Sequence, residues 1–186
     1  MDSTAKGVQQ MVDACERWCR NVAANGDGRR NIVVTGPFGC GKTHVLNASA
    51  RYLRDVRQSV WPAPLPWGHP PSVARVEWAT LVREVTENDN REFADDVKSA
   101  DVVLLDDVGS EEDRFKSGAP VRILGDLLGT LHDKRRFVFI TMNIGPDGWR
   151  ARWDGRVEDR LLRMDAEIVD MWGAGAESFA AVRAMK

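Results

Sequence analysis

Residues 36–43, Gly-Pro-Phe-Gly-Cys-Gly-Lys-Thr, decide the fold of this chain. They follow a β-prone run, residues 31–35, and lead into a helix-prone run. A glycine-rich turn that ends in Gly-Lys-Thr between a strand and a helix is typical of a phosphate-binding loop, because its N–H groups point into one concavity. We expect Lys42 to reach the β- and γ-phosphates and Thr43 to bind Mg²⁺. The predicted nucleotide contacts are Gly36, Pro37, Phe38, Gly39, Cys40, Gly41, Lys42, Thr43 and His44.

Length and composition indicate one globular domain. The chain has 186 residues, of which 43% are hydrophobic and 29% charged, with a net charge of −2. A chain of this length and hydrophobic content can form a hydrophobic core. Because the net charge is slightly negative, any contact with nucleic acid would need a local basic patch. The sequence shows neither a membrane span nor a signal-peptide core, so a cytoplasmic location is expected. Cys15 and Cys19, four residues apart on a predicted helix, are expected to be buried free thiols.

Strand-like and helix-like patterns alternate along the whole chain. Alternation of this kind predicts a parallel, three-layer α/β sheet with helices on both faces. We expect a single domain over residues 1–186, with an N-terminal helix and turn in residues 1–30 and no separate partner-binding domain. The predicted strands are residues 31–35, 73–77, 101–107, 137–141 and 167–171, and the predicted helices 8–22, 44–56, 78–85, 120–131, 156–163 and 177–185.

Residues 57–72 interrupt this alternation. Five of the eight prolines of the chain lie here, together with Trp61 and Trp67. Proline removes backbone donors and disfavours helix, so we expect an extended surface loop. Its tryptophans either fold back on the domain or anchor a partner.

Two acidic residues follow a buried strand-like run. Val102 to Leu105 are apolar, and Asp106 and Asp107 come directly after them. Ligands of an open parallel sheet bind at this carboxyl edge. Asp106 is therefore predicted to hold Mg²⁺, and Asp107 to orient or deprotonate a water that attacks the γ-phosphate. The alternative is a solvated acidic turn.

Polar residues after the next strand extend this hypothesis. Asn143 directly follows the run Phe137 to Met142. Its side chain can hydrogen-bond the attacking water or the γ-phosphate. The alternative is a structural role, because Asn is also a common turn residue. An arginine series at spacings of 4, 4 and 3 predicts one basic helical face. That face is either solvated or carries an arginine finger for a neighbouring subunit's ATP. The series consists of Arg152, Arg156, Arg160 and Arg163.

The order of these motifs resembles one family over nearly the whole chain. GKTH (41–44), SADVVLLDDVG (99–109), FVFITMN (137–143), DGRVEDRLLR (154–163) and ESFAAVR (177–183) follow each other. Together they resemble the DnaC/IstB-like branch of AAA+ ATPases, which includes helicase loaders and transposition helpers. The resemblance implies an AAA+ sheet, ATP hydrolysis at subunit interfaces, and a ring or helical oligomer on single-stranded DNA. By position, Asn143 is similar to the family's first sensor and Arg160 to its arginine finger, with Arg156 as the alternative.

The sequence departs from that family at two positions of the predicted site, and its proline-rich loop also looks longer than the family's usual link. Alanines follow Ser178 and Phe179 where the family has its second-sensor arginine, and the nearest arginine is Arg183. Most AAA+ proteins carry Glu at the position of Asp107, so the shorter side chain predicts slow hydrolysis.

Three functions remain open from the sequence. The first is an ATP-driven helicase loader that contacts single-stranded DNA through Arg114, Lys116 and Arg122 and hydrolyses ATP weakly. The second is an ATP-dependent recruitment switch that barely hydrolyses, such as a transposition helper. The third is a small P-loop kinase, against which the Asp106–Asp107 pair and Asn143 argue. A replicative helicase or a transposase is the partner that the first two imply.

Overall fold

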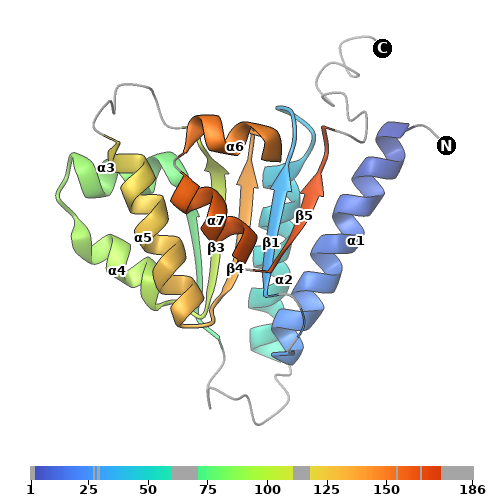
Figure 1. Ribbon diagram of the computed structural model, residues 1–186. Helices are drawn as coiled ribbons and strands as arrows, with labels where there is room; N and C mark the ends of the chain where they lie inside the picture. The colour runs from blue at the N-terminus through green and yellow to red at the C-terminus, as the bar shows by residue number, and fades with distance from the viewer. Residues whose placement is uncertain are drawn as a thin grey trace.

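Five parallel strands form one sheet between two layers of helices (Figure 1). The computed structural model describes residues 3–26, 28, 30–59, 71–110, 118–153, 155–163 and 165–172. The strand order is β2-β3-β4-β1-β5. Their bounds are β1 (Asn31–Thr35), β2 (Val73–Glu77), β3 (Val102–Val108), β4 (Phe137–Met142) and β5 (Ala166–Asp170).

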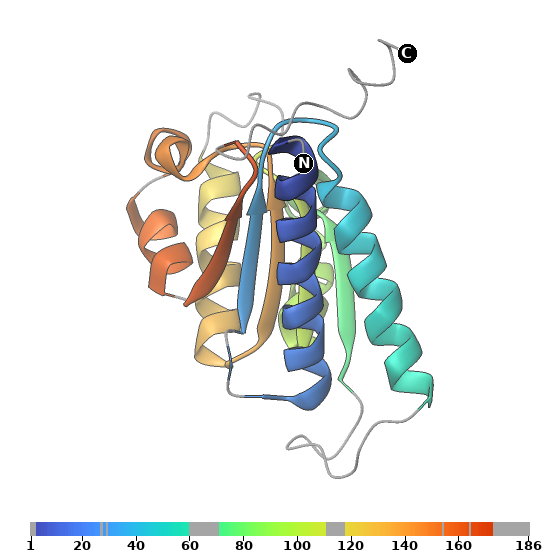
Figure 2. The ribbon, with the colours of Figure 1, turned by 90° about the vertical axis from the view of Figure 1, so that its right-hand side faces the viewer.

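The three central strands are apolar along their length because helices cover both of their faces. Alternate residues of β4 point to opposite layers: Phe137 and Phe139 pack in one core and Val138 and Ile140 in the other. The first core lies under α1 (Ser3–Ala24) and α2 (Lys42–Ser59), which Figure 2 shows together on one side of the sheet. The second core lies under α3 (Trp78–Thr86), α4 (Arg91–Ser99), α5 (Ala119–Asp133), α6 (Pro146–Arg152) and α7 (Gly155–Arg163).

The structure confirms the predicted three-layer α/β fold and all five strands. Pro120 occupies the first turn of α5, as expected of a residue that has no N–H to leave unpaired. The predicted loop over residues 57–72 begins too early, because α2 continues to Ser59. Trp61, Trp67 and the predicted closing helix over residues 177–185 lie outside the described residues. In the part of the chain that is described, no helix is both long and apolar enough to span a membrane.

The arginine series does not form one helical face, so this expectation is wrong for Arg152. Arg152 ends α6, whereas Arg160 lies on α7. Pro146 starts α6, and the buried ring of Trp149 holds it on the second core. The backbone then becomes extended at Trp153, with φ −122° and ψ 161°, so the two helices are separate.

A buried carboxylate joins three strands where they begin, at the edge opposite the phosphate loop. Asp101 is 3% exposed and directly precedes β3. Its Oδ2 accepts hydrogen bonds from the N–H and the hydroxyl of Ser72, both at 2.9 Å. Its Oδ1 accepts a hydrogen bond from Arg136, which directly precedes β4. Asp101 therefore ties together the starts of β2, β3 and β4.

Candidate functional site

The phosphate loop connects β1 to α2 at the carboxyl edge of the sheet. Gly39 and Gly41 have φ values of 76° and 99°, which side chains other than glycine rarely allow. Gly36 has no room for a side chain, because a Cβ there would lie 2.5 Å from the Cβ of Met171. The Met171 N–H in turn donates to the carbonyl of Thr35 at 2.8 Å. Glycines at these positions therefore let the loop curl closely against the end of the sheet.

Lys42 directs its ammonium group to the loop. Its side chain is 6% exposed, and Nζ donates hydrogen bonds to the carbonyls of Gly36 at 2.9 Å and Pro37 at 2.8 Å. A polyphosphate is a stronger acceptor than these neutral carbonyls, since charge-assisted hydrogen bonds are the stronger ones. The amine is thus placed to exchange loop carbonyls for phosphate oxygens.

Asp106 and Thr43 meet across the edge of the sheet. The Thr43 hydroxyl donates to Asp106 Oδ1 at 3.1 Å, and the Thr141 hydroxyl donates to the same oxygen at 2.7 Å. The guanidinium of Arg75 donates to Asp106 Oδ2 at 3.0 Å. A hydroxyl beside a carboxylate is the oxygen donor set that Mg²⁺ accepts when phosphates and waters complete its shell. These residues therefore suit the metal role predicted for them.

A bulge in β3 takes Asp107 out of the regular hydrogen bonding between β3 and β4. The pairing of β3 with β4 shifts between Leu105 and Val108, and Asp107 takes a left-handed φ of 60°. Its N–H donates to the Thr141 hydroxyl at 2.8 Å, and its Oδ1 accepts a hydrogen bond from the amide of Asn143. Asp106 and Asp107 consequently point to different partners although they are adjacent in sequence.

The environment of Asp107 makes its carboxyl harder to ionise than a carboxyl in water. Burial raises the pKa of this carboxyl above its usual value, the hydrogen bond with Ser110 opposes the rise, and the nearby charge of Asp106 adds to it. A carboxyl with a raised pKa is a better proton acceptor once it is ionised. Close by, the side-chain oxygen of Asn143 is buried and accepts no hydrogen bond from the described residues. A water held between these two groups would satisfy it.

Arg160 lies on the other side of the sheet from α2, against α5 of its own chain. Its guanidinium donates to the carbonyl of Gly125, and a Cβ on Gly129 would lie 3.1 Å from its Cζ. Two glycines one turn apart on α5 therefore make room for this side chain. The structure describes one chain, so a role of Arg160 in a neighbouring site stays a prediction. The side chains of Arg156 and Arg163 are outside the described part.

Two residues of the site were not predicted from sequence. Thr141 bonds both Asp106 and the backbone of Asp107, and a hydroxyl inside an otherwise apolar strand was the available signal. Arg75 had no such signal, because a charged residue in an edge strand is ordinary.

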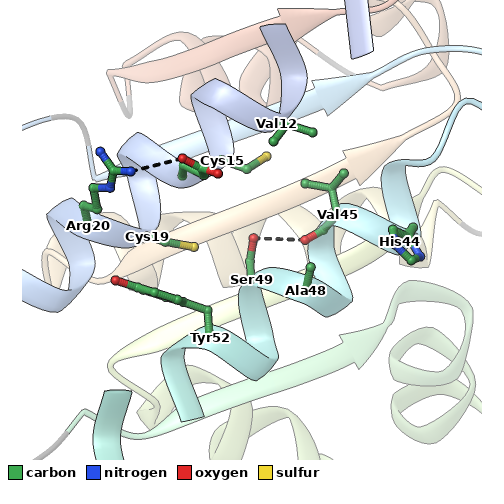
Figure 3. A pocket seen from close by; sticks show the side chains of 10 residues that line it. Val12, Cys15, Cys19, Arg20, His44, Val45, Ala48, Ser49 and Tyr52 are labelled. Carbon is green, nitrogen blue, oxygen red and sulfur yellow. Dashed lines mark hydrogen bonds and ion pairs between the residues drawn. The ribbon is translucent and has the colours of Figure 1, made fainter. Parts of the chain in front are cut away.

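A cavity of about 430 Å³ opens between α1 and α2, directly beyond the phosphate loop (Figure 3). Its walls are mostly apolar, and His44 lies at one end and Tyr52 at the other. Cys15 and Cys19 line it as buried free thiols, as expected. Burial raises the pKa of Cys15, and it raises that of Cys19 to about 11, so both remain protonated near neutral pH.

Comparison with known proteins identifies the family. The model of the bacterial DnaA ATPase domain matches residues 10–163. The chromosomal replication initiator protein DnaA of Caulobacter sp. (strain K31) is 31% identical over 135 residues, which cover 64% of this chain and 23% of that protein. The chain thus spans about a quarter of the length of this curated relative.

Solved structures share the fold at low identity. The AMPPCP-bound DnaA from Aquifex aeolicus has a TM-score of 0.65 at 18% identity, with 88% of this chain and 46% of that chain covered. The replication initiator DnaA bound to AMPPCP and single-stranded DNA has a TM-score of 0.62 at 18% identity, with 85% and 44% covered. The DnaC helicase loader has a TM-score of 0.61 at 16% identity, with 82% and 85% covered.

These findings confirm the AAA+ fold that the resemblance implied. They do not single out the DnaC/IstB-like branch, because DnaA and DnaC structures match with similar scores. The family model, in contrast, covers most of the chain. The chain belongs to the family of the bacterial DnaA ATPase domain and, with it, to the AAA+ ATPases.

Proposed function

We propose that this chain binds ATP with Mg²⁺ at the phosphate loop and hydrolyses it slowly as part of an assembly on single-stranded DNA. The observation that carries the proposal is the meeting of Lys42, Thr43 and Asp106 at one edge of the sheet, with 3.1 Å between the Thr43 hydroxyl and the Asp106 carboxylate. Family membership supports ATP as the nucleotide, and related structures contain an ATP analogue.

Each residue has a defined part in this proposal. Lys42 and the N–H groups of the loop bind the phosphates, and Thr43 with Asp106 holds Mg²⁺. Bound Mg²⁺ would neutralise charge on the phosphate oxygens. Asp107 accepts a proton from the attacking water, and the free side-chain oxygen of Asn143 orients that water. Arg160 of a neighbouring copy stabilises the transition-state charge.

Within replication, we propose a helicase-loading role similar to that of DnaC. The likeness in fold to the DnaC helicase loader supports it, as does the spacing of the motifs. A replicative helicase is then the partner. The alternative is an ATP-dependent recruitment switch similar to the IstB transposition helpers. The hydrogen bond that Asn143 donates to Asp107 favours the switch, because it occupies the carboxylate that should take up the proton.

We propose that single-stranded DNA lies along the N-terminal half of α5 and the segment before it. Arg122 is exposed there and lines a hollow of about 420 Å³ between α3, α4 and α5. Arg91 and Lys98 line it too, together with the carboxylates of Asp95 and Asp126, which pair with Lys98. Arg114 and Lys116, predicted with it, lie outside the described residues. A DnaA structure that contains single-stranded DNA supports this class of ligand.

Replacing Arg122 by glutamine is expected to weaken binding of a single-stranded oligonucleotide and to flatten its salt dependence. Loss of one phosphate contact reduces the slope of log affinity against log salt by about 0.7. Fluorescence anisotropy at several salt concentrations measures this slope. Arg20→Gln is the matched control, because Arg20 is exposed on α1, across the sheet, and pairs with Glu16. Equal slopes for wild type and Arg122→Gln would contradict the assignment.

A mixing experiment tests whether Arg160 acts on a neighbouring copy. Arg160→Ala is expected to bind ATP normally and to lose hydrolysis, whereas Lys42→Ala keeps Arg160 but binds ATP weakly and does not hydrolyse it. Mixing the two inactive variants should restore hydrolysis, because an intact loop then meets an intact arginine across an interface. Steady-state turnover with protein preassembled on single-stranded DNA measures this.

No recovery on mixing, with both variants folded, would remove the arginine-finger role of Arg160. Arg160 would then have a structural role, in which it holds α7 against α5. Fast hydrolysis by the wild type that depends on Arg160 would exclude the recruitment switch. Hydrolysis by the wild type that does not respond to DNA would count against assembly on a single strand.

A further inference from the structure

Arg75 contacts the site from outside both the phosphate loop and the acidic pair. It lies on β2, and its Nη2 is 3.0 Å from Asp106 Oδ2. The Asp106 side chain is 6% exposed, whereas that of Arg75 is 40% exposed. A buried carboxylate is thus neutralised by a cation that reaches it from the solvent side.

The sheet register explains how Arg75 reaches the site. Arg75 pairs with Leu104 in β3, and Asp106 lies two residues further along the same strand. Residues two apart in a strand share a face, so Arg75, Leu104 and Asp106 lie on the same side of the sheet. The long stem of arginine then carries the guanidinium along the strand to the carboxyl edge. The contact follows from the pairing of β2 with β3.

Both oxygens of Asp106 have partners in this arrangement. Hydroxyls of Thr43 and Thr141 occupy Oδ1, and Arg75 occupies Oδ2. The two hydroxyls are neutral and can stay when a cation approaches. The guanidinium carries a full positive charge and repels a second cation at the same carboxylate.

We propose that Arg75 is a resident counter-cation of Asp106 that Mg²⁺ must displace, so that Arg75 lowers the metal affinity of the site. This inference rests on the proposed function, because it concerns the metal of the same nucleotide site. Until the metal arrives, Arg75 stabilises the buried charge, which would otherwise be costly. When the metal binds, the guanidinium of Arg75 moves away from Asp106 into the solvent, to which the side chain is already partly exposed.

Removal of Arg75 therefore has opposite effects on metal affinity and on stability. With a saturating non-hydrolysable ATP analogue, Arg75→Gln is expected to lower the midpoint of a Mn²⁺ titration about fivefold, the size expected for one partly exposed ion pair. Water-proton relaxation follows bound Mn²⁺ directly. Without divalent ions and nucleotide, the variant should unfold at a lower temperature than wild type, and Mg²⁺ should raise that temperature more in the variant.

Arg20→Gln is the matched control, because it removes the same charge from an exposed pair with Glu16 on α1. It should titrate as wild type. An Arg75→Gln midpoint equal to or higher than that of wild type overturns the inference, since Arg75 would then be neutral toward the metal or help to hold it. If Arg75→Gln does not fold, Arg75→Met replaces it, because methionine keeps the length of the stem without the charge: a midpoint below wild type supports the inference, and one at or above wild type overturns it. Wild-type protein that binds neither the analogue nor Mn²⁺ overturns the proposed function instead.

Discussion

Replacing Lys42 by alanine is expected to weaken ATP binding about 100-fold and to abolish hydrolysis. A charge-assisted hydrogen bond to a buried group contributes roughly 1.5–3 kcal/mol, and about 1.4 kcal/mol corresponds to a tenfold change in affinity. The ammonium of Lys42 is buried and faces the loop, where its present partners are two backbone carbonyls. Titration with a fluorescent ATP analogue measures the affinity, and phosphate release measures the turnover.

Lys134→Ala is the control for this prediction. Lys134 is exposed after the end of α5, and its amine donates to the carbonyl of Lys98 at 3.4 Å, far from the phosphate loop in the fold. It should bind ATP as wild type does. Lys42→Ala should also keep its far-ultraviolet circular dichroism, because the loop glycines and the pairing of β1 do not depend on the amine. Unchanged ATP affinity in folded Lys42→Ala protein would contradict the nucleotide assignment.

Asp101→Ala is expected to destabilise the protein by about 3–5 kcal/mol, since removal of one partner leaves a buried ionic group unpaired. Arg136 would lose its carboxylate, and Ser72 would lose the acceptor for both its N–H and its hydroxyl. For a chain of this length, the melting temperature should fall by roughly 10 °C. Urea unfolding and thermal melting both measure the loss.

The control variant is Asp95→Ala, which removes an exposed carboxylate that contacts Lys98 at 3.7 Å. An exposed pair of this kind contributes little, so the melting temperature should stay close to that of wild type. Ligand addition separates stability from function. The folded fraction of Asp101→Ala should still bind ATP, because Asp101 lies at the edge of the sheet opposite the phosphate loop. A loss below about 1 kcal/mol would mean that water replaces Asp101.

The phosphate loop and the acidic pair were predictable because local chemistry determines them. The loop needs glycines at residues 39 and 41 for its positive φ angles, and the apolar run that precedes Asp106 and Asp107 in β3 is visible in the sequence. The three central strands were predictable for the same reason, since helices cover both of their faces and leave continuous hydrophobic runs.

Features that depend on neighbouring elements were not predictable. Arg75 meets Asp106 only because β2 pairs with β3 in one register. The break between α6 and α7 was missed because arginines at helical spacing continue across it, although the backbone is extended at Trp153. The glycines at 125 and 129 gave no hint that Arg160 lies over them. The DnaA family emerged from comparison, since the motifs are shared among AAA+ branches.

The left-handed backbone at Asp107 links the choice of this residue to the shape of the strand. Aspartate and asparagine tolerate this region better than residues with longer side chains. A glutamate here would extend the carboxylate toward the phosphates but would strain the bulge that separates Asp107 from Asp106. The length of the side chain at residue 107 and the backbone conformation there thus constrain each other. Replacing Asp107 by glutamate would therefore also require the backbone of β3 to change at the bulge.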